Sequence, residues 1–95
     1  MEGKKGLDAF PNTNLSDLLE ENHIETVVLG GFLTSCCVES TMRTAYEKGF
    51  NVITLTDCTA DTSIKQYKAA CEGDECTFKL FSKRMTSKEF IKEYL

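Results

Sequence analysis

The sequence has no long hydrophobic run: no apolar stretch approaches the roughly 20 residues that a membrane-spanning helix needs. It also lacks the basic segment followed by an apolar segment that marks a secretory signal. The 15 acidic residues outnumber the 11 basic ones, and a net charge of -4 disfavours nucleic acid as a partner. These absences predict a cytoplasmic protein that binds neither a membrane nor a nucleic acid.

Metal and cofactor signatures are scarce as well. The chain has one histidine, His23, and no C-x-x-C pair. Cys71 and Cys76 could be a ligand pair, but a structural zinc site needs a second pair and the sequence offers none. Gly30-Gly31 lacks the third glycine of a dinucleotide-binding loop. We therefore expect no metal and no cofactor.

Cysteine is the residue type that is well represented. There are five cysteines, at positions 36, 37, 58, 71 and 76. An odd number without an export signal favours a reducing compartment over a disulfide framework. A disulfide between the adjacent Cys36 and Cys37 would be strained, so a redox role for this pair is a minor alternative.

The length of 95 residues allows one small domain, which we place at residues 1–95. Hydrophobic periodicity and capping residues predict alternating helices and strands. The expected helices are 14–22, 37–48, 63–71 and one after Thr86, where Thr86 and Glu89 form a capping box. The expected strands are 27–29, 51–56 and a short one at 78–81, with a loop at 57–61.

This order predicts an α/β fold with three αβα layers. A helix-length crossover joins the first two strands, so they should run parallel, as in part of a doubly wound sheet. Ligands of such sheets bind at the carboxyl ends of the strands. Residues 30–37 and Asp57 fall at these ends.

Cys37 is the candidate nucleophile. It lies where a strand ends, a glycine-rich loop turns and a helix begins. Unpaired N–H groups and the positive end of the helix dipole favour a thiolate there, and an amide N–H can stabilise an oxyanion. A buried structural cysteine is an equally good reading of the spacing alone. We read Cys36, which points elsewhere, as a packing residue.

The segment G-G-F-L-T-S-C-C-V-E-S-T-M-R-T-A-Y, followed by G-F-N-V-I-T-L-T-D-C-T-A, resembles the isochorismatase-like cysteine hydrolases, which include the nicotinamidases. The upstream segment K-K-G-L-D-A-F is similar to the K-x-x-x-x-A-F segment of the same family. Ordered matches over about fifty residues are far more specific than a single short motif.

The resemblance implies a catalytic set of cysteine, lysine and aspartate. Cys37 would be the nucleophile, and Lys4 the lysine, with Lys5 as the neighbour that could replace it. The amides of Leu33 and Cys37 would form the oxyanion hole. The resemblance also implies a cis peptide bond between Phe32 and Leu33. The substrate would be a small molecule with an amide-like C–N bond, cleaved through a thioester.

The family's aspartate lies on a strand upstream of the lysine, and no counterpart is found in this sequence. Asp57 more readily shapes its loop or caps backbone amides. The sequence thus corresponds to the C-terminal portion of the family's domain, and we expect a truncated hydrolase with little activity alone. The alternative is a non-catalytic module that associates through an open sheet edge, either as a homo-oligomer or with a complementing N-terminal half.

Overall fold

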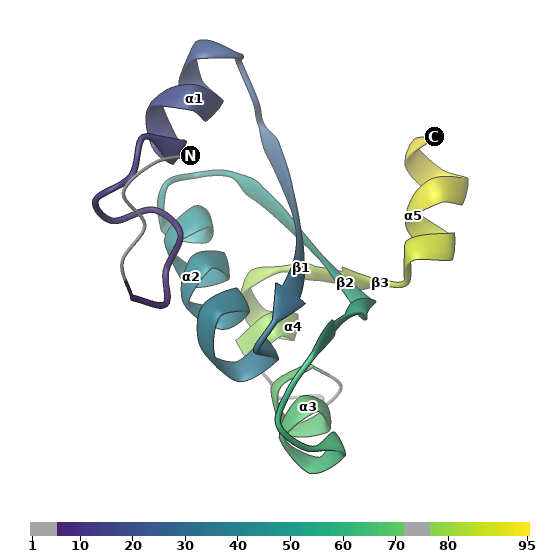
Figure 1. Ribbon diagram of the computed structural model, residues 1–95. Helices are drawn as coiled ribbons and strands as arrows, with labels where there is room; N and C mark the ends of the chain where they lie inside the picture. Colours follow the sequence, from purple (N-terminus) through teal and green to yellow (C-terminus); the bar gives the residue numbers. More distant parts are fainter. Residues whose placement is uncertain (1–5, 72–76) are drawn as a thin grey trace.

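The computed structural model describes residues 6–71 and 77–95. Its elements follow in the order α1 (Leu15–Glu21), β1 (Thr26–Phe32), η1 (Thr34–Val38), α2 (Glu39–Glu47), β2 (Asn51–Ala60), α3 (Ile64–Cys71), α4 (Thr77–Phe81), β3 (Lys83–Met85) and α5 (Ser87–Tyr94). Figure 1 shows β1, β2 and β3 as one sheet, with most of the helices gathered on one side.

The three strands form a parallel sheet in the order β1-β2-β3. Thr26 pairs with Asn51 and Leu29 with Thr54, and the register then shifts before Gly31 pairs with Thr59. The extra residues of β2 at this shift let it bend away from β1. The predicted α/β fold with a parallel, doubly wound sheet is confirmed.

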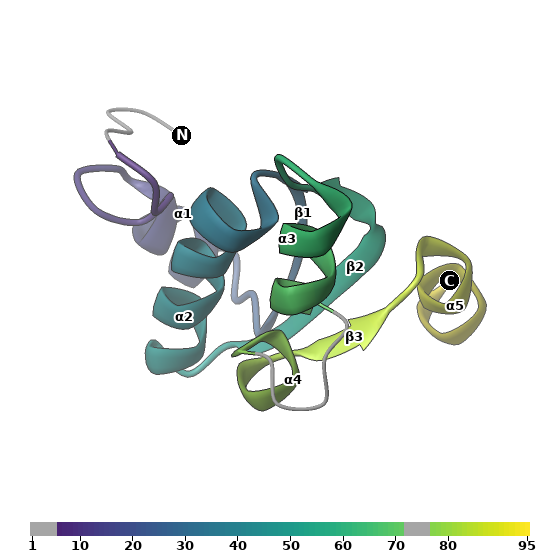
Figure 2. The same cartoon turned by 90° about the horizontal axis from the view of Figure 1, so that it is seen from below.

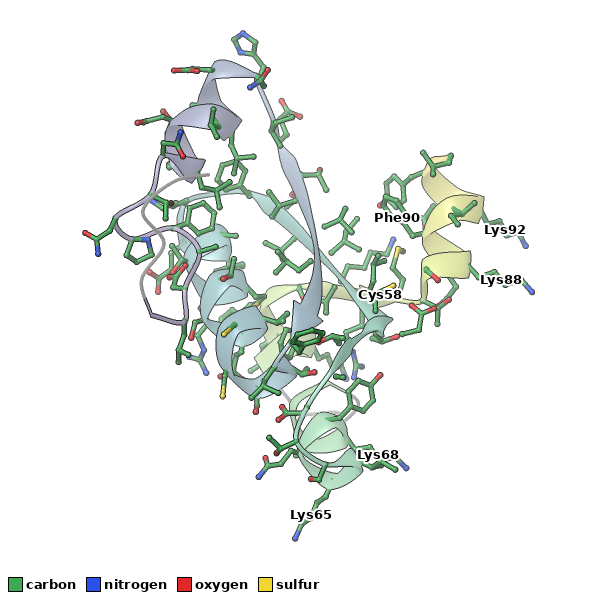
Figure 3. The ribbon with its side chains drawn as sticks, viewed as in Figure 1. Cys58, Lys65, Lys68, Lys88, Phe90 and Lys92 are labelled. Carbon is green, nitrogen blue, oxygen red and sulfur yellow. The ribbon has the colours of Figure 1, made fainter. Side chains whose placement is uncertain are left out.

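The core lies between one face of the sheet and the helices α2 and α4. Its buried apolar side chains come from the N-terminal segment, η1, α2, β2 and α4: Phe10, Val38, Met42, Ala45, Val52 and Phe78. Helix α5 lies on the opposite side of the sheet, apart from the other helices (Figure 2). Its Phe90 faces the strands, whereas Lys88 and Lys92 point outward (Figure 3).

Several predicted boundaries are wrong. Residues 78–81 form helix α4 instead of a strand, because Phe78 and Phe81 lie three residues apart and both pack toward the core. The third strand is the following segment, Lys83–Met85. Residues 57–60 belong to β2 and are not a loop, and Thr59 and Ala60 pair again with the end of β1.

Strand β1 has a neighbour on one side only within the described part of the chain. The other edge of β1 is open. The side chains of this strand include Val28, which is 39% exposed, and Phe32, which is 76% exposed. An apolar, unpaired strand edge is a ready surface for adding another strand.

Candidate active site

Cys37 lies in a helical segment that follows β1 directly. The predicted cis peptide bond between Phe32 and Leu33 is present, and Gly31 before it has a φ of +106°, a conformation that suits glycine. The helix begins at Thr34, earlier than predicted, with a wide π turn in which the Val38 N–H donates to the Leu33 carbonyl at 3.2 Å. Helix α2 continues from η1 without interruption.

Cys37 lines a cleft of about 430 Å³ that opens beside the free edge of β1. The walls are mainly apolar and include Leu7, Leu15, Val28 and Phe32. Among the described residues of this lining, Cys37 is the one ionisable side chain. The cleft therefore presents a thiol in an apolar hollow, with Cys36 and Cys58 as further free thiols of the described segments.

Two side-chain contacts fix the start of the helix that bears the thiol. The Ser35 N–H donates to Oδ2 of Asp61 at 2.7 Å. The fully buried Thr34 hydroxyl lies 2.8 Å from the Thr59 hydroxyl. Hydrogen bonds from the Ser35 side chain and backbone, with one from the Thr62 N–H, lower the pKa of Asp61. The end of β2 thus anchors the first turn of η1.

Asp57 has the role that the sequence favoured for it, as a cap for backbone amides. Its carboxylate accepts the Ser87 N–H at 2.7 Å and the Ser87 hydroxyl at 2.6 Å. The two hydrogen bonds from Ser87 lower the pKa of Asp57. Asp57 therefore holds the N-terminus of α5 and does not line the Cys37 cleft.

The N-terminal segment lies against α2. Asp8 accepts the Phe10 N–H at 2.9 Å and also a hydrogen bond from the Thr44 hydroxyl, and the Ala9 N–H donates to the Thr41 hydroxyl at 3.0 Å. Lys4 and Lys5 lie outside the described residues, so the role of either lysine stays a prediction. The role of the Leu33 and Cys37 amides as oxyanion donors likewise stays a prediction.

Sequence reasoning missed Asp61 and the Thr34–Thr59 pair. The signal was weak because Asp61 is 26 residues from Ser35 and its neighbours read as a loop. The helix was expected to begin at residue 37, so the sequence offered no reason to look for a cap at Leu33, which has no side-chain oxygen and makes no side-chain cap hydrogen bond. A helix that begins after such a residue requires a cap from elsewhere in the fold.

The described residues contain no cluster of three or more His, Cys, Asp or Glu side chains that could hold a metal ion. Among the helices of the same residues, none has the length and apolar character needed to cross a membrane. Cys71 and Cys76 cannot be judged as a ligand pair, because Cys76 lies outside the described residues.

The described residues thus form a parallel α/β sheet with a cysteine in the helical segment that follows β1. The Isochorismatase domain matches residues 2–89, and the chain belongs to the isochorismatase family. It is 36% identical to Nicotinamidase 3 of Arabidopsis thaliana over 69 residues, 73% of this chain and 35% of that protein.

Two further relatives share the family. Maleamate amidohydrolase of Pseudomonas putida is 33% identical over 66 residues, 70% of this chain and 31% of that protein. The crystal structure of an isochorismatase-like hydrolase from Alkaliphilus metalliredigens superposes with a TM-score of 0.90 at 33% identity, over 97% of this chain and 48% of that one. The chain thus spans less than half the length of each of these relatives.

Proposed function

We propose that this chain supplies the thiol part of an amide-hydrolysing site, with Cys37 as the nucleophile. The observation that carries the proposal is the position of Cys37, in an apolar cleft and on a helical segment that follows β1 directly. Two relatives, a nicotinamidase and a maleamate amidohydrolase, are named for the hydrolysis of small amides, which supports this substrate class.

The proposed reaction has two stages. The Cys37 thiolate attacks the amide carbonyl carbon, and the N–H groups of Leu33 and Cys37 hydrogen-bond the resulting oxyanion. The C–N bond breaks as the nitrogen takes a proton, so ammonia or an amine leaves and a thioester remains. Water then attacks the thioester carbonyl, releasing a carboxylic acid and the free thiol.

The reaction also needs a group that takes the thiol proton and gives it to the leaving nitrogen. Lys4, or its neighbour Lys5, is proposed to contribute positive charge. Of the described carboxylates, Asp8, Asp57 and Asp61 each already accept a backbone N–H, and Glu39 pairs with Arg43 at 3.8 Å. We therefore assign the general base to a carboxylate outside the described residues.

The proposed source of that carboxylate is polypeptide that pairs with the open edge of β1 and closes the Cys37 cleft. The unmatched part of the Alkaliphilus metalliredigens structure, of which this chain covers 48%, supports a complementing segment of the same fold. Without it the site lacks its base, and we propose that the isolated chain hydrolyses amides slowly. The free thiols of Cys36, Cys37 and Cys58 favour a reducing compartment, for which we propose the cytoplasm.

The test combines thiol labelling with an assay for ammonia release. Iodoacetamide near neutral pH should label Cys37 before any other cysteine, as read by peptide mass spectrometry. Nicotinamide and maleamate serve as substrates. Cys37→Ser should abolish ammonia release, whereas the control variant Cys58→Ser should leave it unchanged. Preferential labelling of Cys58 or Cys71, or equal activity of Cys37→Ser, would overturn the proposal.

A non-catalytic interaction module is the second candidate, and the exposed apolar edge of β1 favours it. In that case the chain associates with itself or with a complementing half, and the Cys37 thiol catalyses no reaction. Sedimentation of the pure chain together with the ammonia assay separates the two candidates. Stable association without ammonia release, even with the complementing segment present, would favour the module.

A further inference from the structure

The segment at the end of β2 holds Leu33 from both sides. Upstream of Leu33, Gly31 and Phe32 pair with Thr59 and Ala60 in the sheet. Downstream, the Thr34 hydroxyl contacts the Thr59 hydroxyl at 2.8 Å, and the Ser35 N–H donates to Asp61 at 2.7 Å. The position of the Leu33 amide relative to the first helical turn is therefore set by residues 59–61.

Asp61 is the charged member of this segment. One oxygen of its carboxylate accepts the Ser35 N–H, and the other accepts the Thr62 N–H at 2.7 Å. The two hydrogen bonds make the carboxylate a rigid bridge between its own loop and the start of η1. Asp61 lines a separate hollow of about 330 Å³ beside α3 and does not line the Cys37 cleft. It therefore binds the start of η1 from outside that cleft.

We propose that Asp61 is the positioning residue of the thiol site, supplying the helix cap that Leu33 cannot and so holding the Leu33 amide in place against the turn that bears Cys37. This inference rests on the proposed role of Cys37 as the nucleophile. Asp61 does not touch the substrate; it acts through the Leu33–Ser35 backbone.

The same carboxylate places a negative charge at the start of the thiol-bearing helix. This charge offsets part of the helix dipole that favours a thiolate at Cys37. Other charged groups on the elements packed against η1 are already engaged or distant from it. Glu39 of α2 pairs with Arg43 at 3.8 Å, and Asp57 of β2 bonds to Ser87.

The remaining ionisable residues of η1 and of the elements packed against it lie on η1, α2, β2 and α3: Cys36, Tyr46, Glu47, Cys58, Lys65, Tyr67, Lys68 and Cys71. Lys65 and Lys68 extend from the outer side of α3 (Figure 3), and β1 carries no charged residue. Asp61 is thus the charged side chain with a direct hydrogen bond to the first turn of η1.

The test compares Asp61→Asn with Asp57→Asn in the full chain. The two aspartates are matched, since each caps a helix by accepting one N–H at 2.7 Å, but Asp57 caps α5. Two readouts are used: the pH profile of Cys37 alkylation by iodoacetamide, and hydrogen exchange of the amides of residues 33–38 and 87–90.

Asp61→Asn should move the midpoint of the Cys37 alkylation profile to lower pH by about half a unit, because a negative charge leaves the helix start. Below that midpoint the alkylation rate should rise about threefold. Exchange at 33–38 should rise about fivefold from the weakened cap. Asp57→Asn should leave the alkylation profile unmoved and raise exchange at 87–90 instead.

Asp61→Glu keeps the charge and changes the reach, so it should raise exchange at 33–38 without moving the alkylation midpoint. If Asp61→Asn does not fold, the exchange at residues 33–38 in Asp61→Glu tests the positioning role of Asp61. Equal alkylation profiles and equal exchange at 33–38 in the Asp61 and Asp57 variants would overturn the positioning role. Failure of the proposed function itself would appear in the unsubstituted chain, as labelling of Cys58 before Cys37.

Discussion

Asp57 and Ser87 lie thirty residues apart in sequence and are joined by two hydrogen bonds, in which the Ser87 N–H and hydroxyl donate to the two oxygens of the Asp57 carboxylate at 2.7 and 2.6 Å. This contact attaches α5 to the bend of β2, on the side of the sheet that the other helices leave uncovered. The position of α5 therefore depends on a charge as well as on the packing of Phe90.

The dependence on charge predicts a pH effect on stability. The hydrogen bonds from Ser87 lower the pKa of Asp57 in the folded chain below its unfolded value of about 3.9. The stabilisation is thus complete above about pH 3.9 and is lost as the pH falls through the folded pKa. Urea unfolding at a series of pH values should show this loss, and Asp57→Asn should reduce it.

Glu20→Gln, at an exposed position of α1, is the matched control and should leave the pH dependence unchanged. A pH dependence that is the same in Asp57→Asn as in the unsubstituted chain would show that the Asp57–Ser87 contact contributes no stability.

The buried side chain of Phe78 makes α4 part of the core although the helix is short. Phe78 is fully buried, whereas Leu80 of the same helix is 65% exposed. Phe78→Ala should lower the free energy of unfolding by about 3–5 kcal/mol, because it removes a large apolar side chain and leaves a cavity. Leu80→Ala should change it by less than about 0.5 kcal/mol. Urea denaturation measures both, and equal losses would contradict the assignment of the core.

The helices and strands with local signals were predictable from sequence. Asn14, Gly49 and the capping box of Thr86 and Glu89 lie at the ends of elements that form as expected. Hydrophobic periodicity decided between helix and strand correctly for the long elements. It failed at residues 78–81, because a four-residue apolar pattern fits either structure until its neighbours are known.

The candidate site was predictable only in part. The family resemblance indicated the cis bond before Leu33, which is present, and the pattern of strand, glycine-rich loop and helix placed Cys37 after β1. Asp61 and Thr59 escaped prediction because their partners are 26 and 25 residues away in sequence. Such contacts arise from the second pairing of β2 with β1, which no local pattern in residues 57–61 reveals.

Gly30 allows the close approach of β1 and β2 that this second pairing requires. A Cβ at Gly30 would lie 3.1 Å from the carbonyl oxygen of Cys58 and 3.3 Å from its Cβ. Gly30→Ala should therefore destabilise the fold by about 1–3 kcal/mol, as overpacked substitutions do. Thermal unfolding followed by circular dichroism measures the loss.

A second substitution separates the two contacts at Gly30. Cys58→Gly removes the Cβ contact but keeps the carbonyl. Adding Gly30→Ala to a chain that already carries Cys58→Gly should therefore cost less stability than Gly30→Ala costs in the unsubstituted chain. Full stability of Gly30→Ala would mean that the strands move apart without cost.

The open edge of β1 should govern how the chain associates. Val28 is 39% exposed in the middle of this edge strand, next to the cleft that Cys37 lines. A lysine at an edge position opposes pairing with another strand, because its charge would be buried in the contact. Val28→Lys should therefore weaken both self-association and binding of a complementing segment, as measured by analytical ultracentrifugation.

Ile64→Lys, on α3 at a site that is 74% exposed, is the matched control and should associate like the unsubstituted chain. If both lysine variants associate equally, the contact lies elsewhere than on β1. If the unsubstituted chain is a monomer that also binds no complementing segment, the edge has no partner.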